Sequence, residues 1–135
     1  MLSTPLPEAF VDSIRLNSPF GEQLIDALDQ PSPISIRINP RKAAAKDLSS
    51  FRPVSWCTMG YYLEERPSFT LDPSYHAGVY YAQEAASMVL SDLIKQLKLP
   101  EGAHVLDLCA APGGKTSAML DALPLNSAVL ANEIN

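Results

Sequence analysis

The spacing of apolar side chains changes along this chain of 135 residues. Residues 7–16 and 20–28 carry apolar side chains at helical spacing, and a Pro-Ser-Pro segment at 31–33 follows them. We therefore predict two short helices, the second of which ends before these prolines. Residues 34–38 alternate apolar and polar side chains with a period of two, which predicts a half-buried strand.

The second half of the chain follows a pattern typical of an α/β fold. The elements predicted there are strands at 54–56 and 60–63, a turn-rich segment at 67–73, a crossover at 76–81, a helix at 83–98, a buried strand of a largely parallel sheet at 104–108, a helix at 116–123 and a strand at 127–134. This order predicts a small N-terminal α+β domain over residues 1–72. It also predicts that residues 73–135 begin a Rossmann-like domain.

One run of residues, DLCAAPGGKT at 107–116, joins the end of an apolar strand to a glycine-rich turn and a helix start. Such junctions bind nucleotides in α/β proteins. Gly113 and Gly114 lack side chains where the backbone turns sharply and approaches a ligand. The first N–H groups of the following helix would face that ligand.

The residues of this turn discriminate between classes of nucleotide cofactor. A phosphate-binding loop requires a glycine where Cys109 stands, and Pro112 lacks the N–H group that would bind a phosphate. The dinucleotide fingerprint is also absent, because the two glycines of the turn are adjacent. Binding of ATP through a phosphate loop therefore remains only an alternative.

An acidic residue after the next strand favours a nucleoside cofactor without a polyphosphate. Glu133 follows the glycine turn by roughly 20 residues, the offset at which doubly wound folds place a carboxylate on ribose hydroxyls. S-adenosylmethionine fits this arrangement. Glu133 would contact its ribose, and Lys115 and the helix N–H groups would meet its carboxylate.

Three motifs together resemble a known family. The sequence DLCAAPGGKT followed by ANEI resembles the cofactor motifs of the RNA 5-methylcytosine methyltransferases, the RsmB/RsmF and Nop/Sun group. The segment YHAGVYYAQEAASM at 75–88 is similar to the family's pre-Rossmann segment, and SIRINPRK at 35–42 to its R-x-N-x-x-K signature. The three motifs occur in the family's order, and the RsmF-like ribosomal RNA branch is the best match.

The resemblance implies transfer of a methyl group from S-adenosylmethionine to carbon 5 of cytosine in RNA. The expected substrate is rRNA, and tRNA is the alternative. It implies a methyltransferase domain that is incomplete in residues 73–135. The predicted cofactor-binding residues are Cys109, Ala110, Ala111, Pro112, Gly113, Gly114, Lys115 and Glu133.

The same resemblance places no catalytic residue in this chain. The family's two catalytic cysteines belong to motifs expected downstream of Asn135, so we predict that the isolated chain is inactive. Cys109 is predicted to line the cofactor, and Cys57 to be a core residue. The two cysteines are far apart and lack histidine partners at ligand spacing, so we expect no disulfide framework and no metal site.

The charge of the chain bears on RNA binding. A net charge of −5 and a pI near 4.8 disfavour a freestanding nucleic-acid-binding domain. One basic cluster, Arg37, Arg41, Lys42 and Lys46, is the exception, and its members either contact RNA phosphates or form a solvated turn. A non-catalytic RNA-binding module therefore stays open as a second alternative.

The chain shows no signal-peptide pattern and no apolar run long enough to cross a bilayer. We therefore expect a cytoplasmic protein that does not bind membranes. The sequence leaves its oligomeric state open.

Overall fold

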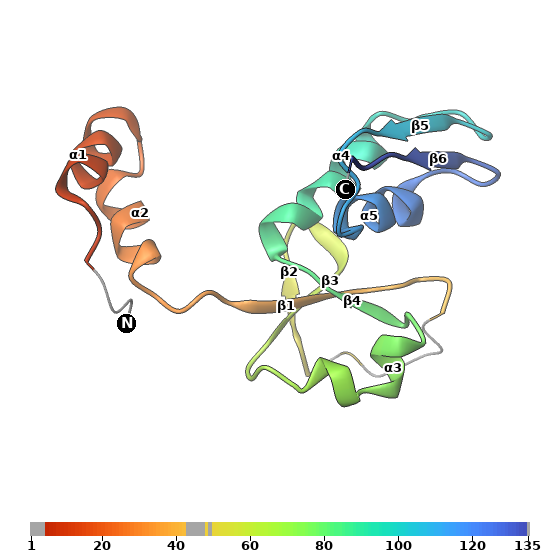
Figure 1. Ribbon diagram of the computed structural model, residues 1–135, viewed down its shortest axis with the longest axis horizontal. Helices are drawn as coiled ribbons and strands as arrows, with labels where there is room; N and C mark the ends of the chain where they lie inside the picture. Colours follow the sequence, from red (N-terminus) through yellow and green to blue (C-terminus); the bar gives the residue numbers. More distant parts are fainter. Residues whose placement is uncertain (1–4, 43–47, 49, 135) are drawn as a thin grey trace. The chain divides into compact units, whose positions relative to one another are not determined.

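The computed structural model describes residues 5–42, 48 and 50–134, and the chain falls into two units, Met1–Pro33 and Ile34–Asn135. Each unit has its own secondary structure (Figure 1). In the described part of the chain, no helix combines the length and the apolar character that crossing a bilayer requires.

The first unit is a pair of helices, α1 (Glu8–Asn17) and α2 (Gly21–Leu28). The sequence predicts both. Ser18 has extended backbone angles because it precedes a proline, and α1 ends there. An exposed ion pair links the two helices, with Nε of Arg15 at 2.6 Å from Oε1 of Glu22.

The second unit begins with a four-stranded antiparallel sheet of order β2-β3-β1-β4. Its strands are β1 (Ile34–Ile38), β2 (Arg52–Val54), β3 (Cys57–Leu63) and β4 (Tyr80–Ala82). The first three are predicted from the sequence, with small shifts of their ends. The prediction of a crossover over 76–81 is wrong in part, because β4 forms there by pairing with β1, a long-range contact that local pattern does not show.

The turn-rich segment between β3 and β4 contains a 3-10 helix, η1 (Phe69–Leu71), and a short helix, α3 (Pro73–His76). The Asp72 carboxylate accepts a hydrogen bond from the Ser74 backbone N–H at 2.8 Å and so caps α3. Tyr80 packs against Phe69 and Tyr75, with ring centroids 6.2 and 5.8 Å away. Tyr75 and Tyr80 therefore belong to the core of this part of the fold.

The remaining elements form the start of a parallel α/β arrangement. They are η2 (Ala85–Met88), α4 (Val89–Gln96), β5 (His104–Asp107), α5 (Gly114–Ala122) and β6 (Ala128–Ala131). Strands β5 and β6 pair in parallel, with His104 opposite Ala128 and Asp107 opposite Ala131. This part of the fold follows the sequence prediction, except that the helix expected over 83–98 opens with a 3-10 turn.

The strand at 104–107 is less buried than the sequence predicts. Leu106 and Leu130 are 54% and 70% exposed, whereas Val105 and Val129 pack against a cluster of Ile94, Met119 and Leu123. Helices α4 and α5 therefore cover one face of the two-stranded sheet. The opposite face has no covering element in the described part of the chain, so the prediction of a buried strand is wrong here.

A close contact joins the antiparallel sheet to the α/β part. Met88 of η2 is fully buried in a cluster with Val54, Cys57 and Ala85, which confirms Cys57 as a core residue. Gly60 on β3 makes this approach possible, because a Cβ atom there would lie 2.7 Å from the Met88 sulfur. Met88 consequently fixes the start of α4 against the sheet.

The predicted domain division between residues 72 and 73 stays a prediction. In the structure the chain divides into its two units after Pro33 instead. Strand β4, after residue 72, completes a sheet whose other strands precede it.

Candidate cofactor-binding site

The glycine loop runs from the end of β5 to the first residue of α5, and an acidic residue at the strand end holds it. Asp107 accepts hydrogen bonds from the Cys109 backbone N–H at 3.2 Å and from the Thr116 hydroxyl at 2.6 Å. Gly113 has a φ of +96°, a conformation that favours glycine. The carboxylate of Asp107 therefore fixes both ends of the turn.

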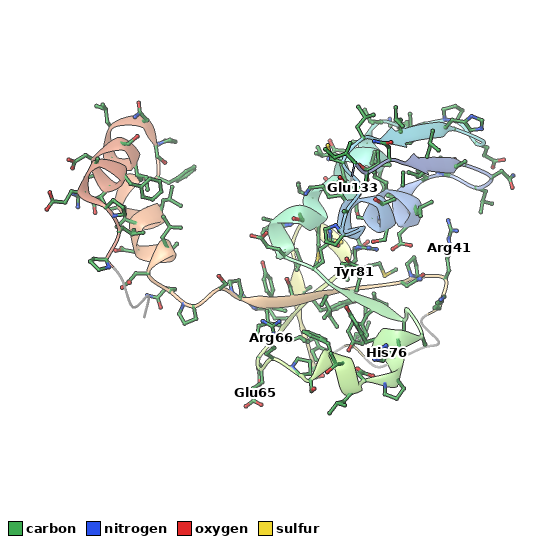
Figure 2. All side chains as sticks on the ribbon, in the orientation of Figure 1. Arg41, Glu65, Arg66, His76, Tyr81 and Glu133 are labelled. Carbon is green, nitrogen blue, oxygen red and sulfur yellow. The ribbon has the colours of Figure 1, made fainter. Side chains whose placement is uncertain are left out.

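The end of β6 holds the loop from a second side. Oε2 of Glu133 accepts a hydrogen bond from the Ala111 backbone N–H at 3.0 Å, and Oε1 accepts one from the Ile134 N–H at 2.8 Å. The Ala110 N–H donates to the Asn132 carbonyl at 3.0 Å. Figure 2 shows Glu133 at the end of β6, beside the loop.

The antiparallel sheet holds the loop from a third side. The Tyr81 hydroxyl donates to the Pro112 carbonyl at 3.1 Å, and the Gln83 side-chain NH₂ group donates to the Gly114 carbonyl at 3.1 Å. A Cβ atom on Gly114 would lie 3.4 Å from the Tyr81 ring and 3.5 Å from the Gln83 amide nitrogen. Gly114 therefore gives β4 close access to the start of α5.

A cavity of about 220 Å³ lies beside these contacts, between the loop and residues 81–87. Its lining residues are Tyr81, Ala82, Gln83, Glu84, Ser87, Cys109, Ala110, Ala111, Pro112, Gly114 and Lys115. Six of the eight predicted cofactor-binding residues thus meet in one place. Gly113 and Glu133 are not in the lining, although Glu133 bonds to Ala111, which is.

Lys115 supplies positive charge at this cavity. It is exposed at the N-terminal end of α5, and its ammonium group has no hydrogen bond or ion pair within residues 5–42, 48 and 50–134. A cation at a helix N-terminus is unfavourable with the helix dipole unless an anion joins it. The arrangement of Lys115 and the helix N–H groups is therefore suited to a carboxylate or another anion.

The loop has few free backbone donors of its own. The N–H groups of Cys109, Ala110, Ala111 and Gly113 all donate within the protein, the last to the Ala110 carbonyl at 2.6 Å, and Pro112 has none. The loop therefore lacks the converging N–H groups that cradle a polyphosphate. This arrangement disfavours the phosphate-loop alternative.

The predicted basic cluster is divided by the structure. Arg37 is 2% exposed, and its guanidinium bonds to Gln83, Ser117 and Asp121. Burial lowers the pKa of the Arg37 side chain from its usual value. Because all three of its nitrogens are engaged inside the protein, Arg37 does not fit the predicted contact with RNA phosphates.

Arg41 and Lys42, two other members of the cluster, lie at the surface. Arg41 donates to the Leu120 carbonyl at 3.1 Å, and the Lys42 ammonium donates to the Ala77 carbonyl at 2.8 Å. Both side chains are exposed, and Figure 2 shows Arg41 in the segment that follows β1. Lys46 lies outside the described residues.

Sequence reasoning left Tyr81 and Glu84 out of the site and gave Gln83 no firm role. The sequence offers only a weak signal for them, a pair of tyrosines followed after one alanine by Gln83 and Glu84. Within the described residues, no group of three or more His, Cys, Asp or Glu side chains is arranged to hold a metal ion. Both cysteines are free thiols, Cys57 buried and Cys109 exposed at the cavity.

Comparison with known proteins identifies the family. The N-terminal domain of 16S rRNA methyltransferase RsmF matches residues 6–85. The chain belongs to the RsmF family. Residues 94–135 match a second family description, 16S rRNA methyltransferase RsmB/F, which covers β5, the glycine loop, α5 and β6.

Curated relatives and solved structures agree with the RsmF assignment. The chain is 32% identical to the ribosomal RNA small subunit methyltransferase F of Cronobacter sakazakii and 30% identical to that of Citrobacter koseri, over 97% and 96% of its length. It spans about 30% of the length of either relative. This chain therefore corresponds to only part of such a protein.

The solved structures share the fold. A methyltransferase homolog from Pyrococcus horikoshii is 27% identical, with a TM-score of 0.76 over 96% of this chain and 45% of its own. A second solved structure, 19% identical, has a TM-score of 0.79 over 98% of this chain and 34% of its own. The predicted α/β class, an N-terminal α+β part followed by the start of a Rossmann-like methyltransferase domain, is confirmed.

Proposed function

We propose that the gene product containing this chain methylates carbon 5 of a cytosine in rRNA, with S-adenosylmethionine as the methyl donor. This chain contributes the glycine-loop part of the cofactor site. The observation that carries the proposal is the loop itself, fixed from three sides, with the Lys115 ammonium, which has no partner among the described residues, beside the cavity.

The chemistry of the lining fits this cofactor. Lys115 and the first N–H groups of α5 match its carboxylate, and the Glu133 carboxylate matches its ribose hydroxyls. The Ala111 and Ile134 backbone N–H groups donate hydrogen bonds to the Glu133 carboxylate and so hold it beside the glycine loop.

The size of the cavity supports a site for part of the cofactor rather than for all of it. A volume of about 220 Å³ is below the roughly 300–1,000 Å³ typical of pockets for whole small ligands. The cavity therefore suits the methionine part of the cofactor.

S-adenosylmethionine, when bound, would supply an electrophilic methyl group. The residues of this chain would hold and orient it, and the nucleophile and general acid would come from elsewhere in the full protein. Cys109 is exposed at the cavity with Asp107 bonded to its backbone, which suits a wall residue. We therefore assign no catalytic residue here and expect the isolated chain to be inactive.

The names of the relatives support rRNA as the substrate class, and Arg41 and Lys42 are the exposed cations proposed to contact its phosphates. A cytoplasmic location follows from the proposed substrate. The alternative substrate is tRNA. The methylation assay described below compares rRNA with tRNA and so distinguishes these two substrates.

The test is calorimetric titration of the full-length gene product with S-adenosylhomocysteine and, separately, with ATP. We expect binding of S-adenosylhomocysteine, weakened about tenfold or more by Lys115→Ala and by Glu133→Gln, and unchanged by Lys95→Ala on α4 as a surface control. Methylation of rRNA or tRNA transcripts is then assayed with labelled cofactor. Binding of ATP alone, or methyl transfer by the isolated chain, would overturn the proposal.

A further inference from the structure

Gln83 is held rigidly to the antiparallel sheet although it lies just beyond β4. Its backbone N–H donates to the Ser35 carbonyl at 3.2 Å, and its carbonyl accepts a hydrogen bond from the Ser35 hydroxyl at 2.6 Å. The residue is 8% exposed. The position of its side chain is therefore set by β1.

The orientation of the Gln83 amide is set by Arg37. The amide oxygen accepts a hydrogen bond from Nε of Arg37 at 2.9 Å. Because a guanidinium only donates, the oxygen has to face Arg37, and the NH₂ group has to point the other way. It points to the Gly114 carbonyl, 3.1 Å away.

Arg37 is itself locked to the helix that follows the glycine loop. Its Nη2 atom donates a hydrogen bond to the Ser117 hydroxyl at 2.8 Å, and its Nη1 atom forms an ion pair with Asp121. The Arg37 side chain is 3% exposed. The chain of contacts therefore runs from α5 through Arg37 and Gln83 back to the first residue of α5.

We propose that Gln83, oriented by Arg37, is a positioning residue for the glycine loop. The four-stranded antiparallel sheet thereby forms part of the cofactor site. Tyr81, two residues earlier on β4, also holds the loop by donating a hydrogen bond to the Pro112 carbonyl. These two bonds fix the carbonyls on either side of Gly113, where the backbone takes its positive φ. The inference rests on the proposed cofactor function.

The chain offers a matched pair of variants. Gln83→Glu keeps an oxygen for Arg37 and removes the donor to Gly114. Ser91→Ala removes a comparable bond, from the Ser91 hydroxyl to the Ala118 carbonyl at 3.3 Å, one turn further along the same helix. The first variant changes the loop contact, and the second changes only the docking of α5.

The experiment uses the full-length gene product and has two readouts. The first is hydrogen exchange of the loop amides, in particular Ala111 and Gly113, without ligand. The second is the Kd for S-adenosylhomocysteine. We expect Gln83→Glu and Gln83→Leu to raise loop exchange and to weaken binding roughly tenfold, which corresponds to the loss of one well-placed hydrogen bond. Ser91→Ala leaves both readouts at their wild-type values.

The outcomes separate this inference from the proposed function. Wild-type affinity and wild-type loop exchange in both Gln83 variants would overturn the inference and leave the cofactor assignment standing. Equal weakening by Gln83→Glu and Ser91→Ala would also overturn it, because general docking of α5 would then set the affinity. A wild-type protein that does not bind S-adenosylhomocysteine would overturn both.

Discussion

Arg37 and Asp121 lie 84 positions apart in the sequence and form an ion pair whose side chains are 3% and 18% exposed. The pair joins β1 to α5. Arg37 belongs to a basic cluster in the sequence, but in the structure this ion pair holds it in the interior. The cost of desolvating two charges is offset only while both partners are present.

Removing one partner of this pair should therefore be strongly destabilising. We expect Arg37→Met to lower the free energy of unfolding by about 3–5 kcal/mol, since it leaves the Asp121 carboxylate without its cation. The double variant Arg37→Met/Asp121→Leu should recover most of this loss. Urea unfolding of the four proteins of the double-mutant cycle measures the coupling. Equal stability of the single and double variants would contradict a buried pair.

Gly60 should not tolerate even one extra carbon. A Cβ atom there would lie 2.7 Å from the Met88 sulfur and 3.0 Å from Cβ of Val54. We expect Gly60→Ala to cost about 1–3 kcal/mol, the usual range for overpacking a core. Thermal unfolding checks this value. In the background Met88→Ala, which removes the sulfur, the same substitution should cost less, and an unchanged cost would show that Met88 is not the obstacle.

Tyr80 gives the stability a defined dependence on alkaline pH. Burial, with help from the hydrogen bond to Asp72, raises the pKa of its hydroxyl from 10.0 to about 12. The folded state therefore holds this proton more tightly than the unfolded state. The resulting stability is complete below pH 10 and is lost as the pH rises through about 12.

The Tyr80→Phe variant isolates this contribution from those of other groups. At neutral pH it should cost about 1 kcal/mol, because the bond to Asp72 is lost. The difference in unfolding free energy between wild type and variant should then shrink between pH 10 and 12. Urea unfolding at each pH measures this difference. A constant difference across this window would contradict the raised pKa.

The two exposed members of the basic cluster should contribute to RNA affinity through charge alone. Arg41→Ala/Lys42→Ala in the full-length gene product should weaken binding of an rRNA transcript and reduce the slope of log K against log salt by about two. Filter binding over a range of salt concentrations measures both. Lys95→Ala is the control for loss of a surface cation, and an unchanged slope in the double variant would exclude these residues from the interface.

Local pattern was a good guide wherever the neighbours in sequence decide the structure. Pro19 and the prolines at 31 and 33 bracket α2, and the alternation over 34–38 gives β1. The glycine turn was also predictable, because a positive φ at Gly113 and a strand-end carboxylate at Asp107 are local requirements. The loop-holding role of Asp107 follows from these requirements.

Local pattern failed where distant segments meet. Strand β4 has only three residues and exists because it pairs with β1, about 40 positions earlier in the chain. The exposure of Leu106 was equally unpredictable, since its burial depends on which elements cover that face.

The sequence by itself determined the family, the order of most elements and the residues of the glycine loop, because each depends on side chains close together in the chain. Only the tertiary structure decided that Arg37 is interior, that Gln83 and Tyr81 reach the loop, and that Lys115 remains without a partner in the described part of the chain. The physical reason is that hydrogen bonds and ion pairs between segments depend on packing, which brings together residues that no local period relates.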